Sequence, residues 1–245
     1  MSSRILHARV SDESGVAAIS LALREWEPAL DLYASIENPF VFEPDGTLYA
    51  FVLSKARTRF RHHEKVVAPG DLLVIPQSIT LEADPAIDLV CIRHDGVPPY
   101  HFRERFIQGV GFEHLSASSR DAVEERIAES DRRYRLSVAH VAAASRPTPI
   151  ATSPFALRLV VGIEGSIEVA AVDPERPSIR DPLVIDSPSL ALVPAGIDFE
   201  ISGSGTAFIV GVLPETVHDA LRDRAALERG PEWSPEPTPR SHPPG

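Results

Sequence analysis

An all-β fold built from two similar barrels is predicted by three features of the sequence: short apolar runs, turn signals between them, and an internal repeat. The apolar runs at residues 40–42, 48–53 and 72–75 are separated by turn-forming segments such as Pro-Gly-Asp at 69–71. Regular short strands with this punctuation are typical of antiparallel sandwiches and barrels. Similar runs return at 135–141 and continue to 207–212.

Composition sets the limits for this fold. The 245 residues allow one large domain or two smaller ones, and a hydrophobic fraction of 43% is sufficient for packed cores. The net charge of −11 disfavours nucleic acid as a partner. No run approaches the roughly 20 apolar residues of a membrane helix, so we expect a soluble cytoplasmic protein without a membrane partner. Cys91 is the only cysteine and lies in an apolar run, which favours a buried structural thiol.

Helices are predicted around and between the barrels. Val16, Ile19 and Leu23 recur at helical spacing, and Pro28 could open a second short helix after the first. The predicted order is an N-terminal helical and strand extension at 1–35, barrel 1 at 36–115, a linker helix at 116–134, barrel 2 at 135–214, a short helix at 215–229 and a disordered proline-rich tail at 230–245.

The internal repeat relates two segments about 118 residues apart. Residues 69–82 match residues 187–200, with Pro76 over Pro194 and no gap, and residues 51–55 match 161–165. Each copy reads as a turn, an apolar strand, a proline-containing turn and another strand. A repeat of this length is too long for a solenoid and indicates a duplicated domain.

The repeated segment resembles a motif of the cupin family, G-x5-P-x-G-x2-H. Gly70 and Pro76 follow its spacing in the first copy, and Pro188, Pro194 and Gly196 follow it in the second. Residues 163–165 resemble the end of the other cupin motif, G-x5-H-x-H-x3,4-E-x6-G. The resemblance implies a two-domain bicupin, in which two small jelly-roll-like barrels pack as a pseudo-dimer.

Catalytic cupins hold a divalent metal with three histidines and one carboxylate, and the resemblance allows these positions to be located here. The histidine of the second motif falls on Leu81 and Phe199, and the glutamate of the first motif falls on Leu48 and Arg158. The remaining slots, at 41–44 and 151–154, contain Glu43 as their one potential ligand. Because apolar side chains and a guanidinium cannot bind a cation, we predict that neither barrel carries the family's metal and that no cofactor is needed.

An alternative set of ligands lies outside these slots, namely His62, His63, His101, Glu104 and His114. The first two are adjacent, so in a strand they would point to opposite faces, and a solvated turn is the simpler interpretation. The other three lie in a segment that also reads as a linker between the barrels. If these residues did bind Fe, Mn, Zn or Ni, the chain would be a metal-dependent cupin enzyme, such as a sugar isomerase or a dioxygenase.

Arg158 is the preferred functional residue. If it points into barrel 2, its guanidinium needs either a carboxylate such as Glu168 or an anionic ligand. We expect Arg158, Glu168 and Phe199 to line the cavity of barrel 2, and Leu48, Leu81 and Glu43 to line that of barrel 1. Arginines at 57, 59 and 61 alternate on one strand face, which is either solvated or anion-binding.

These observations lead to a functional hypothesis. We expect a non-catalytic, metal-independent bicupin that binds a small polar or anionic molecule, such as a sugar or an organic acid. The same chain could act as an assembly module, with a homodimer as its simplest form. The metal-dependent enzyme is the alternative.

Overall fold

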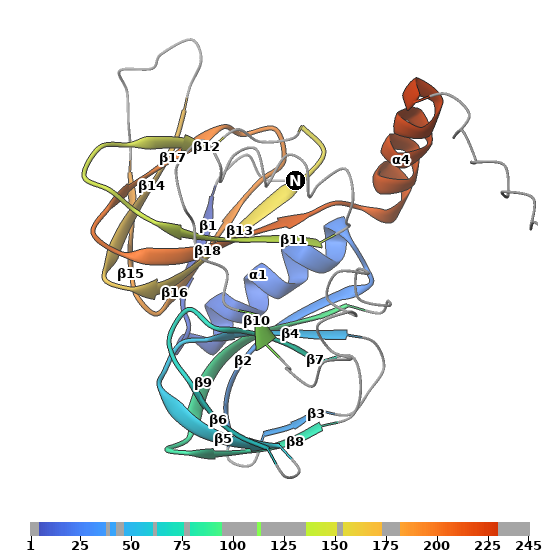
Figure 1. Ribbon diagram of the computed structural model, residues 1–245. Coiled ribbons are helices and arrows are strands. Elements are labelled where there is room, and N and C mark those ends of the chain that lie inside the picture. Colours follow the sequence, from blue (N-terminus) through green and yellow to red (C-terminus); the bar gives the residue numbers. More distant parts are fainter. Residues whose placement is uncertain are drawn as a thin grey trace, which may run out of the picture.

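The computed structural model describes residues 5–37, 40–42, 47–60, 63–75, 79–94, 112–113, 136–150, 154–172 and 182–229. Two strand-rich units are arranged one above the other in Figure 1, with helix α1 (Glu13–Trp26) between them and helix α4 (Glu215–Arg229) at the periphery. The all-β prediction is therefore confirmed. The predicted linker helix at 116–134 and the tail at 230–245 lie outside the described residues.

Barrel 1 is formed by two antiparallel sheets. The five-stranded sheet contains, in spatial order, β10 (Phe112–Glu113), β7 (Leu72–Ile75), β4 (Thr47–Val52), β9 (Ile87–His94) and β2 (Leu30–Glu37). The four-stranded sheet contains β3 (Phe40–Phe42), β8 (Ile79–Asp84), β5 (Ala56–Phe60) and β6 (His63–Val67).

Barrel 2 has the same two-sheet plan. Its five-stranded sheet contains β1 (Leu6–Arg9), β16 (Ser189–Val193), β13 (Leu157–Glu164), β18 (Thr206–Val212) and β11 (Leu136–Ala142). Its four-stranded sheet contains β12 (Thr148–Ile150), β17 (Phe199–Gly203), β14 (Ser166–Ala171) and β15 (Leu183–Asp186).

The strand register allows single residues of barrel 1 to be aligned with single residues of barrel 2. Leu48 lies opposite Ile75 and Arg93, whereas Arg158 lies opposite Val193 and Gly211. Both partners in barrel 2 are 118 positions after those in barrel 1. Leu48 and Arg158 therefore occupy the same place in the two barrels, as the sequence alignment predicted.

A β-bulge in barrel 2 shifts this alignment by one residue. Register slips between Gly162 and Glu164 on β13, and one extra residue on a bulged strand is the usual cause of such a slip. Beyond the bulge, Glu168 lies opposite Val184 and Ser202. Arg57 has the corresponding neighbours, Val66 and Asp84, so Glu168 occupies the place of Arg57.

The two five-stranded sheets share one hydrophobic core between the barrels. Phe51 of β4 and Phe208 of β18 belong to this core, with ring centroids 5.0 Å apart. Helix α1 contributes Val16, Ile19 and Leu23 to the same cluster. Each barrel also has its own interior cluster, so β4 and β13 are buried on both faces.

The N-terminal segment connects the barrels. β1 pairs with β16 of barrel 2, and the chain then passes through α1 into β2 of barrel 1. The second helix expected after Pro28 is not formed, because β2 begins at Leu30 and pairs along its whole length with β9. Leu30 and Leu32 are both buried in the core between the barrels, and this packing requires the alternation of a strand.

Glu27 ties α1 to α4. Its carboxylate is buried and accepts hydrogen bonds from the backbone N–H groups of Ala29, at 3.1 Å, and of Glu215, at 3.0 Å. The second bond satisfies a donor in the first turn of α4, where a negative charge is favourable. The neighbouring Trp26 donates from Nε1 to the carbonyl of Val212 at 3.2 Å. These bonds fix the start of α4, which coincides with the predicted helix at 215–229.

Replacing Glu27 by glutamine should lower the free energy of unfolding by about 1–3 kcal/mol, because a charged acceptor of two backbone N–H groups becomes a neutral one. Urea denaturation followed by circular dichroism measures the change. Glu25 is exposed in the last turn of α1, two residues before Glu27, so Glu25→Gln is the matched control and should change stability by less than about 0.5 kcal/mol. Equal effects of the two substitutions would contradict this role for Glu27.

Candidate functional site

Arg158 lies inside barrel 2. It alternates on β13 with Leu157 and Leu159, which both belong to the core between the barrels, and it shares its face with Val160 of the barrel interior. Its side chain is completely buried, with an exposure of 0%. Nη1 lies 3.5 Å from the carbonyl oxygen of Leu157, to which it donates. The sequence prediction that this side chain points into the barrel is consistent with this placement.

The row of residues across the sheet explains how the arginine fits. Val193 and Gly211 lie directly opposite Arg158 on the two adjacent strands, and Ser137 lies opposite Gly211 one strand further. Gly211 has no side chain that could crowd the guanidinium. Ser137 is buried and offers a hydroxyl on the same face, while the buried Phe199 packs with Val193 in the interior cluster. The row thus combines one cation with small, apolar and hydroxyl neighbours.

This arrangement determines what the interior of barrel 2 can bind. A guanidinium is ionised at all ordinary pH values and presents a planar fork of donors that matches a carboxylate or a phosphate. A divalent cation would be repelled by it. The site therefore favours an oxyanion, provided by the protein or by a ligand.

Glu168, which the sequence placed beside Arg158, is on the opposite face of its sheet. It is exposed, and its carboxylate accepts a hydrogen bond from the Ser202 hydroxyl at 3.0 Å. Ile167 and Val169 on either side of it face the barrel interior. The expectation that Glu168 lines the cavity of barrel 2 is therefore wrong, because strand alternation directs its side chain outward.

Barrel 1 presents an apolar residue at the corresponding place. Leu48 is fully buried and packs in the interior cluster with Leu89 and Cys91. Cys91 is thus a buried thiol, as predicted. Of the other residues expected to line the cavity of barrel 1, Leu81 lies on β8 opposite Phe40, and Glu43 lies outside the described residues.

Tyr33 brings a polar group to this part of barrel 1. It lies opposite Cys91 on the edge strand β2 and is half-buried. Burial raises the pKa of its phenol above the ordinary value, and the adjacent Cys91 side chain raises that pKa further. Tyr49 also has a raised pKa, caused by its burial in the core between the barrels. Both phenols therefore stay protonated, and Tyr33 keeps a hydroxyl that can donate.

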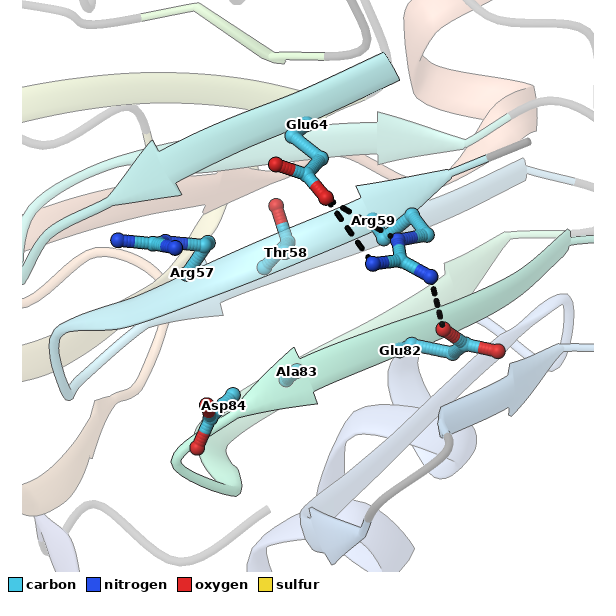
Figure 2. A pocket seen from close by; sticks show the side chains of 7 residues that line it. All are labelled: Arg57, Thr58, Arg59, Glu64, Glu82, Ala83 and Asp84. Carbon is cyan, nitrogen blue, oxygen red and sulfur yellow. Dashed lines mark hydrogen bonds and ion pairs between the residues drawn. The ribbon is translucent and has the colours of Figure 1, made fainter. Parts of the chain in front are cut away.

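An open groove of about 490 Å³ lies on the outer face of barrel 1. Figure 2 shows Arg59 of β5 held between Glu64 and Glu82, with Nη2 3.0 Å from Glu64 and Nη1 3.7 Å from Glu82. Arg57 extends away from this group in the same view. Arg57 and Arg59 share the exposed face, as their alternation predicted, and position 61 lies outside the described residues. Asp84 also lines the groove.

Carboxylates outnumber arginines in the described lining of the groove. Its two arginines face three carboxylates, those of Glu64, Glu82 and Asp84, so the described lining carries a net charge of −1. This excess disfavours the anion-binding interpretation of the arginines. The acidic partners were not identified from the sequence, although Glu82 and Asp84 alternate on one strand and could have been matched with Arg57 and Arg59.

The alternative metal ligands are mostly beyond the described residues. This applies to His62, His101, Glu104 and His114, while His63 is placed on β6 opposite Phe60. Within the described parts of the chain, no three His, Cys, Asp or Glu residues gather closely enough to hold a metal ion.

The helices described in the structure include none that is long and apolar enough to cross a membrane.

Comparison with known proteins identifies the fold. No family model and no curated protein matches the chain. Among solved structures, a mutant of Bacillus subtilis oxalate decarboxylase OxdC is similar over 88% of this chain and 78% of its own, with 11% identity and a TM-score of 0.51. A cupin 2 conserved barrel domain protein from Leptotrichia buccalis is similar over 87% and 90%, with 12% identity and a TM-score of 0.43. The likeness to the oxalate decarboxylase shows a shared fold, and it agrees with the two-barrel cupin fold that the repeated motif predicted.

The two raised tyrosine pKa values predict a loss of stability at high pH. A phenol whose folded pKa exceeds its unfolded value of about 10 stabilises the fold below that pH, and the contribution disappears as the pH rises through the folded pKa. We expect the free energy of unfolding to fall above about pH 10. Absorbance at 295 nm across an alkaline titration measures ionisation, and Tyr49→Phe should remove part of the latest phase. Ionisation of every tyrosine near pH 10 in the folded protein would contradict the prediction.

Proposed function

We propose that the chain is a metal-independent bicupin that binds a small anionic molecule, such as an organic acid or a sugar acid, inside barrel 2. Arg158 is the observation that supports this proposal. A fully buried guanidinium has a large desolvation cost and is retained where an oxyanion offsets that cost. In the corresponding place of barrel 1 the chain has Leu48, so the fold itself does not require an arginine there.

The neighbours of Arg158 support an organic anion as the occupant. A carboxylate can accept two parallel hydrogen bonds from a guanidinium. Beside it, Phe199 could cover a carbon skeleton, and Ser137 adds a polar group to the same row. Ligand sites commonly combine an apolar lining with a few polar groups of this kind.

Metal independence is supported by the chemistry of the former ligand positions. Phe199 and Leu48 provide no lone pairs, and Arg158 adds a positive charge that opposes a cation. The enzyme alternative, a sugar isomerase or dioxygenase with Fe, Mn, Zn or Ni, would need ligands from outside these positions. It predicts near-stoichiometric metal in protein purified without chelator, which elemental analysis detects.

Substituting Arg158 by leucine tests the proposal, because leucine is the residue of barrel 1 at this place. Without ligand, the substitution should leave stability unchanged or raise it, since replacing a buried charge by a hydrophobic residue is often neutral or stabilising. In the wild type, a bound organic acid at 100 times its Kd should add about 2.7 kcal/mol, or roughly 5–10 °C in Tm. Arg158→Leu should abolish that shift. Thermal unfolding against a panel of mono- and dicarboxylates, sugar acids and neutral sugars measures it.

Arg57→Leu is the matched control, because it makes the same substitution at an exposed arginine of the outer groove. It should keep the ligand-induced shift. If Arg158→Leu instead destabilised the ligand-free protein by about 3–5 kcal/mol, the arginine would be the partner of a buried protein carboxylate, and the proposal would be overturned. Stoichiometric metal in the purified protein would also overturn it.

A further inference from the structure

The groove on the outer face of barrel 1 contains two rows of charged residues, and the two rows are paired differently. In the first row, Arg59 lies opposite Glu64 on β6 and Glu82 on β8, and its guanidinium contacts both carboxylates. We call these three residues the Arg59 triad. In the second row, Arg57 lies opposite Asp84 on the adjacent strand. Both rows line the same open groove of about 490 Å³, which is within the size range of small-molecule sites.

The second row leaves its two charges open. Opposite charges at facing positions of an antiparallel pair usually attract each other. Among the described residues, however, neither the guanidinium of Arg57 nor the carboxylate of Asp84 has a hydrogen-bond or ion-pair partner. Figure 2 shows the two side chains pointing in different directions, with no interaction between them. Both are exposed, so an incoming molecule can reach a cation and an anion on neighbouring strands.

The Arg59 triad has an excess of negative charge. One guanidinium is shared by two carboxylates, which leaves a net charge of −1, and none of the three side chains has a further partner within the described part of the chain. The side chains of Glu64 and Glu82 are 53% and 63% exposed. Because a carboxylate has about four acceptor positions, each can accept from an additional cation while it keeps its contact with Arg59.

The distance between the rows sets the length of a molecule that could use both. Arg57 and Arg59 are two positions apart on β5, which corresponds to roughly 7 Å along an antiparallel strand. Thr58 and Ala83 separate the rows, and neither is charged. An α-amino acid whose side chain ends in an ammonium on a flexible stem of three or four carbons can bridge a gap of this size.

The arginines of the groove are particular to barrel 1. In barrel 2, Glu168 occupies the place of Arg57, and Ala170, which lies opposite Glu200, occupies the place of Arg59. The fold therefore forms this outer face without either arginine. The alternation of a free pair and a negatively charged triad is a property of one barrel and is not required by the architecture.

We propose that the outer groove of barrel 1 binds a free basic amino acid, such as lysine or ornithine. The α-carboxylate binds Arg57, the α-ammonium binds Asp84, and the side-chain ammonium binds the carboxylates of the Arg59 triad. The net charge of +1 on the ligand complements the net charge of −1 on the described lining. Because the site is exposed, binding is weak and falls with salt. The site is separate from the interior of barrel 2 and does not rest on the proposed function.

Calorimetric titration of the full chain at low ionic strength with lysine, norleucine and cadaverine tests the proposal. Norleucine keeps the α-amino and α-carboxyl groups but has no side-chain ammonium, and cadaverine has two ammonium groups but no carboxylate. Lysine should bind at least about threefold more tightly than either. Equal binding of lysine and cadaverine would overturn the proposal, because an acidic surface would explain it. Equal binding of lysine and norleucine, or no binding of lysine, would also overturn it.

Single substitutions assign the contacts. Arg57→Gln should weaken lysine binding by about two- to fivefold and should not weaken cadaverine binding, since only lysine carries a carboxylate. Glu82→Gln should weaken the binding of both and leave that of norleucine unchanged. Arg9 is an exposed arginine on β1 of barrel 2, so Arg9→Gln is the matched control for Arg57→Gln. An equal loss of lysine binding in these two variants would overturn the proposal, because the effect would then reflect only the net charge of the protein.

The groove and the interior of barrel 2 fail independently in this design. Arg158→Leu should leave lysine binding unchanged, and loss of lysine binding in that variant would overturn the inference for the groove. Failure of every organic acid to shift the Tm, together with lysine binding that depends on Arg57, would overturn the proposed function and support the groove.

Discussion

The packing of one five-stranded sheet against the other is the constraint on which the rest of this structure depends. β4 and β13 are buried on both faces. One face of each strand packs against the other barrel, and the opposite face packs inside its own barrel. Along such a strand every side chain is buried in one of two cores, and neighbouring residues belong to different cores. Phe51 and Phe208 fill the shared core, whereas Leu48 and Arg158 can only face inward. The position of Arg158 is therefore a consequence of the contact between the barrels.

The repeat was predictable because it is carried by turns and apolar strands, which depend on local sequence. The gap-free alignment of 69–82 with 187–200 agrees with the observed register, and the match of 51–55 with 161–165 correctly placed Leu48 at the position of Arg158. Features that depend on tertiary contacts were not predictable in the same way. Residues 30–37 form a strand because β9 provides a partner for them. Glu27 reads as an ordinary helical residue, and its role requires the distant Glu215.

The error over Glu168 has a specific physical cause. Its neighbours Ile167 and Val169 are the inward-facing residues of β14, so Glu168 must face solvent. The sequence alignment of the repeats ended before this strand, and the bulge at 162–164 changes the offset between the copies. An alternation test on residues 166–171 would have placed Glu168 outside, because its apolar neighbours alternate with it. Glu168 was matched with Arg158 because their charges are opposite, without testing which face of the strand each side chain occupies. This gave the wrong partner for Arg158.

The rows that contain Leu48 in barrel 1 and Arg158 in barrel 2 suggest how a duplicated barrel can change its chemistry without changing its fold. In each row, the residue directly opposite the arginine on one adjacent strand is small or apolar. Barrel 2 meets this condition with Arg158 beside Gly211, and barrel 1 meets it with Arg93 beside Leu48. Moving the arginine by one strand also changes its environment: Arg158 is enclosed, while Arg93 reaches the edge strand, where Asp31 and α1 are available. The same row thus provides a closed cationic interior in one barrel and an ion pair with the edge strand in the other.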